Sequence, residues 1–296
     1  MCVVAISLPV LVFGLLVFAF GTVVGSFLNV CIWRIPRGLS VTRPLRSLCP
    51  HCGRPIRSWD NVPLLSFLML RGRCRDCAAP ISWRYPFVEG LTGLLFLGLS
   101  VLQRDSGPGQ VIVMGLVVCL LIVASGVDIE FSIIPDELSA FGLIGGLLAG
   151  LLLPQLHVGD QPYHTFRTLT GTYHLDGLIG SAIGAAAGGA LVLLFALVGA
   201  LIFRKEAIGM GDAKLMAVVG AFLGWKVAVL SFFLSPFFGL LYGVPLLLFK
   251  ERHVMPFGPF LSVGAVLVIL MRPVACGYLN AYLDLVMEIV RLLAHP

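Results

Sequence analysis

Two aspartates stand where apolar segments begin or end. In "KEAIGMGDAKLMAVVGAFLGW" (205–225), Asp212 opens an apolar segment directly after Gly209 and Gly211, and Asp128 closes an earlier apolar segment. An ionisable group at membrane depth costs about 3 kcal/mol to insert and by default indicates function. The two acids are therefore candidates for a reacting pair.

The chemistry of such a pair follows from its charges. Two carboxylates close together in a low dielectric cannot both ionise easily, so the pair holds one proton and one negative charge near neutral pH. The ionised member can activate water while the protonated member polarises a peptide carbonyl, as in aspartic proteases. The alternative for Asp212 is a helix N-cap, for which Asp is a favoured residue. The alternative for Asp128 is an interfacial acid that meets water alone.

Five further residues are expected to line the substrate path or support the pair. Glycines beside the acid let a substrate backbone lie close to it. The expected residues are Gly209, Gly211, Glu130, Asp136 and Lys214.

Four cysteines form two CxxC pairs, "CPHC" and "CRDC", separated by twenty-one residues. Two such turns facing each other offer four thiolates in a tetrahedron, which structural zinc prefers. A reducing cytoplasm argues against disulfides, and no thioredoxin-like context supports a redox pair. We therefore expect structural zinc, with no position left for a catalytic water. The expected ligands are Cys49, Cys52, Cys74 and Cys77.

The composition is that of a membrane protein. Apolar residues make up 58% of the 296 residues and charged residues 12%, with a mean hydropathy of +1.01. Soluble domains have about 25% charged residues. The predicted fold is an all-α polytopic membrane protein with about eight transmembrane helices and a small cytoplasmic zinc module. Beyond a first span within residues 1–31, the expected spans are about 86–102, 111–127, 137–153, 177–203, 213–224, 227–249 and 258–273.

The charge distribution orients these spans. Residues 32–85 contain ten of the twenty Lys and Arg residues against two acids, so this segment is expected in the cytoplasm and the N-terminus on the outer side of the membrane, which is the periplasm if the membrane is a bacterial inner membrane. Asp128 and Asp212 then share the cytoplasmic face. Four units are predicted: 1–31 as the first span, 32–85 as the tetracysteine module, 86–273 as the peptidase bundle and 274–296 as an amphipathic C-terminal segment.

At this point the sequence resembles a known family. "GMGD" at 209–212 is similar to the GxGD signature of membrane aspartyl proteases. With "DIEFSIIPD", "GSFLNVCIWRIPRG", "RYPFVEGLTG" and the tetracysteine loop, the chain resembles the type IV prepilin peptidases from about residue 21 to 260. The resemblance implies that Asp128 and Asp212 are catalytic. It also implies cleavage of a short basic leader from prepilins and pseudopilins at the cytoplasmic face of the bacterial inner membrane.

The same resemblance implies a second activity. Many members methylate the new N-terminus with S-adenosylmethionine, in the region of the first cytoplasmic loop. No glycine-rich nucleotide motif supports this from the residues, so the donor rests on resemblance alone. Polar residues in the matching segments are Asn29, Arg34, Asn61 and Glu89.

The charged residues indicate which partners the protein could bind and which other functions it could have. A basic leader needs acids near the pair, such as Glu130, Asp136, Glu137 and Glu206, while the positive loop is expected to meet anionic lipid headgroups. No nucleic-acid partner is expected. The alternatives are a proton-coupled transporter that uses the two acids, or a zinc-bearing assembly protein without catalysis.

Overall fold

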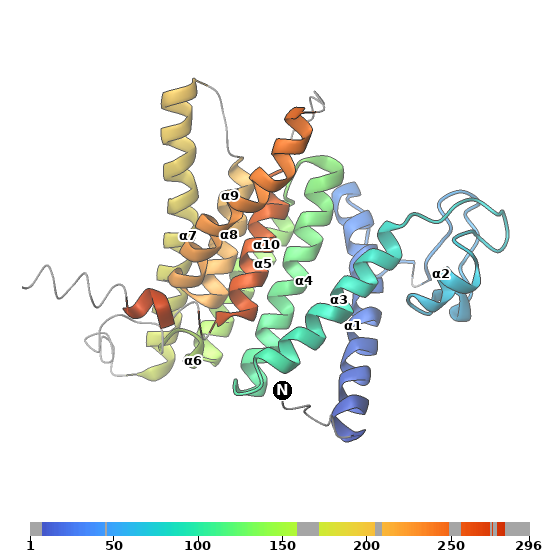
Figure 1. Cartoon of the computed structure of the whole chain (residues 1–296), viewed down its shortest axis with the longest axis horizontal. Coiled ribbons are helices and arrows are strands. Elements are labelled where there is room, and N and C mark those ends of the chain that lie inside the picture. Colours follow the sequence, from blue (N-terminus) through green and yellow to red (C-terminus); the bar gives the residue numbers. More distant parts are fainter. Residues whose placement is uncertain are drawn as a thin grey trace, which may run out of the picture.

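The computed structural model describes residues 8–44, 46–158, 172–204, 209–248, 256–272, 274 and 277–281. Within these residues the chain is helical and has no strand, only two isolated β-bridges. This confirms the all-α prediction for the described part (Figure 1). The long helices are α1 (Leu8–Arg34), α3 (Arg84–Leu102), α4 (Pro108–Phe131), α5 (Asp136–Leu152), α7 (Tyr173–Phe203), α8 (Met210–Leu223), α9 (Trp225–Leu248) and α10 (Gly258–Leu270).

The membrane character of the chain is confirmed. Five helices, α1, α3, α4, α7 and α9, are long and apolar enough to cross a bilayer. Helices α5, α8 and α10 lie at three further expected spans but have 17, 14 and 13 residues. The count of eight spans therefore stays a prediction.

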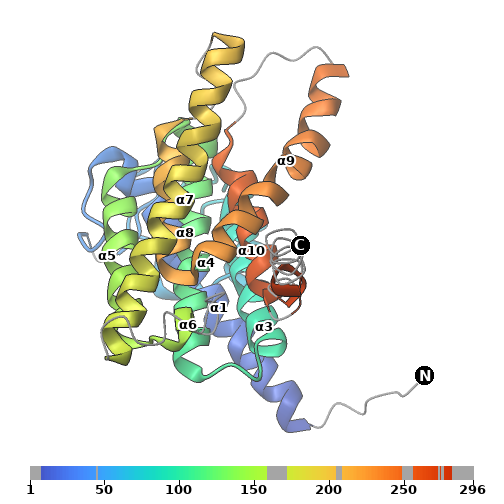
Figure 2. The ribbon, with the colours of Figure 1, turned by 90° about the vertical axis from the view of Figure 1, so that its left-hand side faces the viewer.

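Helix α4 forms the centre of the bundle. Its apolar side chains at Val117, Val118 and Ala124 are fully buried. Helices α1, α3, α8 and α10 all pack against α4, and the two views place it in the middle of the assembly (Figures 1 and 2). The last turn of α4, which carries Asp128, is thereby surrounded by other helices.

Glycines bring α7 and α8 into backbone contact. A methyl group added at Gly184 would overlap the carbonyl oxygen of Gly220, and one added at Gly188 would overlap that of Met216. Small residues at a spacing of four permit this approach between membrane helices. The close contact at Gly184 and Gly188 fixes the position of α8, which carries Asp212.

The polar segment between α1 and α3 lies beside the bundle. Apart from η1 (Ile35–Arg37), η2 (Ser58–Asn61) and α2 (Leu65–Met69), it has no helix. Figure 1 shows it next to the pair α1 and α3. We call residues 38–83 the loop module. Most of the C-terminal segment 274–296 lies outside the described residues, and residues 277–281 are helical.

Candidate active site and metal centre

Asp128 is fixed at the end of α4 by the beginning of α10. Its side chain is 6% exposed, and its Oδ2 accepts the backbone N–H of Gly258 at 3.0 Å. A methyl group at Gly258 would lie 2.7 Å from that same oxygen. Only a residue without a side chain lets the α10 backbone approach the carboxylate this closely.

Asp212 lies in the first turn of α8 and is 7% exposed. Its Oδ2 accepts the backbone N–H of Gly209 at 3.3 Å. Helices α4 and α8 pack together, and Asp128 is close enough to act electrostatically on Asp212. The structure thus brings together two buried acids that are 84 residues apart in the sequence.

The two glycines among the expected supporting residues have different surroundings. A methyl group at Gly209 would meet nothing nearer than the Asp212 carboxylate, at 3.6 Å, whereas one at Gly211 would lie 3.1 Å from Cβ of Ile134. Among the described residues, Gly209 therefore leaves space beside the acid. Gly211 instead allows α8 to pack against the segment that follows α4.

Two of the predicted acids form ion pairs. Lys214 Nζ lies 2.5 Å from Asp136 Oδ1, which joins the first turns of α8 and α5. Glu130 pairs with Arg84 at the start of α3. These groups are partly to largely solvent-exposed, so each pair contributes about 0–1 kcal/mol to stability.

Sequence reasoning missed Gly258. No periodic pattern connects it to Asp128, from which it is separated by 130 residues. The available local signal was "PFGPF" (256–260), a glycine and a proline at the start of an apolar helix.

The four cysteines form one cluster. Their sulfur atoms all lie within 4.8 Å of one another, with 3.9 Å between those of Cys49 and Cys77. Zinc at about 2.3 Å from each of four sulfurs requires edges of about 3.8 Å, so the set fits a tetrahedral thiolate site. His51 is not part of the cluster. Within the described chain, no other group of potential metal ligands was found.

The two halves of the cluster share one backbone design. Gly53 donates its N–H to the carbonyl of Cys49 at 2.8 Å, and Ala78 donates to Cys74 at 2.9 Å. Both turn residues have positive φ. Burial opposes ionisation of Cys49, but hydrogen bonds from the backbone and from neighbouring thiols lower its pKa to about 7. A thiol that ionises near neutral pH is suited to metal binding.

Ion pairs organise the rest of the loop module. Arg75 donates two hydrogen bonds to Asp60, at 2.8 and 2.7 Å, and these bonds hold the pKa of Asp60 below its usual value. Arg54 and Arg57 lie 3.7 and 3.9 Å from Asp76. These pairs join the two cysteine turns and their connection.

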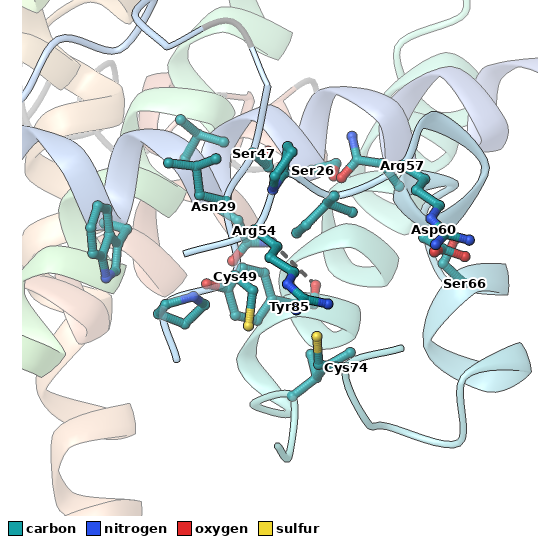
Figure 3. A pocket seen from close by; sticks show the side chains of 18 of the residues that line it. Ser26, Asn29, Ser47, Cys49, Arg54, Arg57, Asp60, Ser66, Cys74 and Tyr85 are labelled. Atoms are coloured by element: carbon teal, nitrogen blue, oxygen red, sulfur yellow. Dashed lines mark hydrogen bonds between the residues drawn. The ribbon is translucent and has the colours of Figure 1, made fainter. Parts of the chain in front are cut away.

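A cavity of about 520 Å³ opens between the loop module, the end of α1 and the start of α3 (Figure 3). Its lining includes the four polar residues from the matching segments, Asn29, Arg34, Asn61 and Glu89. Cys49 and Cys74 also line it. The volume is in the range of small-molecule and cofactor sites.

Together these features define a helical membrane protein with two buried carboxylates at one end of its bundle and a four-thiolate site beside it. Two family models match the chain: the bacterial peptidase A24 N-terminal domain over residues 19–102, and the type IV leader peptidase family over residues 115–244. The chain belongs to the type IV leader peptidase family.

Curated relatives agree over most of their length. The chain is 36% identical to the prepilin leader peptidase/N-methyltransferase of Aeromonas hydrophila, covering 89% of this chain and 92% of the relative. It is 35% identical to the type 4 prepilin-like proteins leader peptide-processing enzyme of Escherichia coli, covering 85% and 91%. No solved structure matches the chain significantly. This membership favours the peptidase prediction over the transporter and assembly-protein alternatives.

Proposed function

We propose that the chain is a membrane aspartyl endopeptidase that removes the leader from prepilins and pseudopilins, and that Asp128 and Asp212 are its catalytic pair. The observation that carries this proposal is that two buried carboxylates lie on helices that pack together, α4 and α8, and that each accepts the backbone N–H of a glycine. Family membership and the names of the relatives support the substrate class.

In the proposed reaction the two carboxyl groups have different roles. The ionised carboxylate takes a proton from water, whose oxygen attacks the scissile carbonyl carbon, while the protonated carboxyl donates a hydrogen bond to the carbonyl oxygen. The tetrahedral adduct then releases the amine, which receives the proton. Burial excludes bulk water and strengthens both interactions.

The setting of the reaction follows from the charge pattern. The ten basic residues of segment 32–85 favour a cytoplasmic loop module, a periplasmic N-terminus and an active site at the cytoplasmic face. Eight spans agree with this arrangement, because the eight long helices alternate in direction along the chain. Glu130 and Asp136 would meet a basic leader by exchanging their partners Arg84 and Lys214. The positive module would meet anionic headgroups.

Two cofactors belong to the proposal. The four cysteines would hold structural zinc, which would give the loop module a fixed core that its largely unburied apolar residues do not supply. S-adenosylmethionine would serve N-methylation of the new N-terminus, in line with the relatives' names. When bound, it supplies an electrophilic methyl group that the N-terminal amine takes up with loss of one proton.

The test is cleavage of a prepilin peptide by the purified protein in detergent. Asp128→Asn and Asp212→Asn should each lower the rate by at least about 100-fold, the usual contribution of acid–base catalysis. Asp105→Asn, which changes a solvent-facing acid in the loop between α3 and α4, is the matched control. Full activity in either catalytic variant would rule out the assigned pair.

A further inference from the structure

The short helix α2 of the loop module lies beside the membrane-crossing helix α3 and not beyond its end. The N–H of Leu64, at the N-cap of α2, donates to Glu89 Oε2 at 2.8 Å. Glu89 lies five residues after Arg84, the first residue of α3, which is about 7–8 Å along the helix axis. Figure 1 shows α2 next to the helix pair α1–α3 rather than above its upper end. The bond therefore places α2 at the depth of the first turns of α3.

The ion pair of Arg84 with Glu130 marks one limit of the apolar region of the bundle. Arg84 begins α3 and Glu130 lies in the last turn of α4, and both helices are long and apolar enough to cross a bilayer. Charged side chains lie near the ends of spanning helices because they are costly within the hydrocarbon. Helix α2 lies on the apolar side of this limit, within the depth of about 5–10 Å at which interfacial helices bury their apolar face.

One face of α2 is apolar and uncovered within the described residues. Its three members are 58, 70 and 76% exposed and share one side at helical spacing: Leu65, Leu68 and Met69. Ser66 on the other side is buried; its Oγ accepts the N–H of Val62 at 2.9 Å and donates to the carbonyl of Trp59 at 3.1 Å. These bonds hold α2 and the preceding turn η2 together, with the apolar face outward.

The apolar face continues into the exposed apolar surface of α3. The ring of Phe67 in α2 packs on that of Trp83, with centroids 4.8 Å apart. Trp83 is the N-cap of α3, and Phe87 lies one turn further along the same side; they are 75 and 66% exposed. Tryptophan is enriched at membrane–water interfaces. The face of α2 is thus continuous with a surface that faces lipid where α3 crosses the membrane.

We propose that α2 is an interfacial anchor, whose face of Leu65, Leu68 and Met69 inserts among the upper acyl chains of the leaflet at this end of the bundle. The anchor holds the loop module against the membrane. Arg71 and Arg73, both exposed after α2, extend to the lipid phosphates. The proposal requires that α3 crosses the membrane and is independent of leader cleavage. Unlike an electrostatic contact between the module and headgroups, insertion of apolar side chains does not require anionic lipid.

Tryptophan quenching by lipid tests the insertion. The full-length protein, with zinc added, is reconstituted in phosphatidylcholine vesicles whose acyl chains carry bromine close to the headgroup. All four native tryptophans are replaced by phenylalanine, and Leu68→Trp is compared with His51→Trp, which probes an exposed position in the first cysteine turn. The brominated lipid should quench Leu68→Trp at least about 3-fold more strongly than His51→Trp, and iodide in the water should quench them in the reverse order.

A charge on the apolar face should withdraw the anchor from the lipid. In a background that retains only Trp59, which is 67% exposed in η2, Leu68→Glu should lower quenching by the brominated lipid at least about 2-fold. His51→Glu adds the same charge away from this face, is the matched control and should leave quenching unchanged. Circular dichroism and thermal unfolding identify the variants that fold.

Three results would each overturn the proposal. In the first, iodide quenches the folded Leu68→Trp protein as strongly as His51→Trp, which would place α2 in water. In the second, Leu68→Trp is shielded from both quenchers, which would show that a second copy of the chain or another protein covers the face. In the third, quenching by the brominated lipid appears only after anionic lipid is added, which would leave the arginines as the sole attachment.

Discussion

At the scale of single residues, backbone N–H groups hold the two aspartates of the proposed catalytic pair in place. Gly258 donates to Asp128 from the first turn of α10, so the partial positive charge of a helix N-terminus is directed at a buried carboxylate. This contact favours a fixed orientation of Asp128 relative to α8. A side chain at position 258 would have to displace the carboxylate itself.

Gly258→Ala is therefore expected to lower the rate of leader cleavage about 10- to 100-fold, because its Cβ would lie 2.7 Å from Asp128 Oδ2. Steady-state kinetics in detergent should show the loss in kcat rather than KM. Gly115→Ala, in α4, the helix that carries Asp128, meets only ordinary contacts with Phe96 at 3.7 Å and is the control. Equal activity in the two variants would show that the Gly258 contact does not position Asp128.

At the scale of the elements, one helix contact decides where Asp212 lies. Helices α7 and α8 touch through Gly184, Gly188 and Gly220, with backbone against backbone. Their apolar surfaces gain little from the hydrophobic effect in lipid, so close packing is the main attraction. The position of the α8 acid is consequently a property of α7 as well.

Gly184→Ala should destabilise the protein by about 1–3 kcal/mol, since a Cβ there overlaps the carbonyl of Gly220 and neither backbone can rotate away. Thermal or SDS-induced unfolding would measure the change. Gly189→Ala, five positions further along α7, meets only ordinary contacts, with 3.4 Å to Ala217, and should leave stability within about 0.5 kcal/mol of the wild type. Identical unfolding of both variants would contradict the proposed packing role.

The positions of the helices and the cysteine cluster could be predicted from the sequence, because short patterns within the chain indicate them. Apolar runs give the helices, and two CxxC turns give the four ligands. The approach of Asp128 to Asp212 followed from topology, which places helix ends at a common depth. The bonds from Gly258 to Asp128 and from Leu64 to Glu89 could not be predicted, because each joins distant segments at single atoms without any repeat or charge complement.

At the scale of the whole molecule, the loop module and the helix pair α1–α3 share the cavity, and two of the cysteines form part of its wall. Metal binding and binding of the proposed methyl donor are therefore expected to be coupled in both directions, as thermodynamic linkage requires. Most apolar side chains of the module are not buried, so we expect its fold to depend on the metal.

Removing the metal with a chelator should weaken binding of S-adenosylhomocysteine, which is the proposed donor without its methyl group, at least 10-fold and make residues 38–83 sensitive to protease, while the helices stay resistant. Mass spectrometry of the fragments and calorimetry would measure both effects. Readdition of zinc is the control and should restore both. A module that stays protected in the metal-free protein would show that its ion pairs suffice to hold it.

The side-chain amide of Gln103 links α3 to α10. It is 2% exposed and donates from the end of α3 to the carbonyls that close α10, at 2.8 and 3.2 Å. At its other end, beside the two acids, α10 is tied to α4 by the bond from the Gly258 N–H to Asp128. Helix α10 is thus held by a buried hydrogen bond at each end. A substrate helix that parted α10 from the bundle would also have to release the contact that orients Asp128.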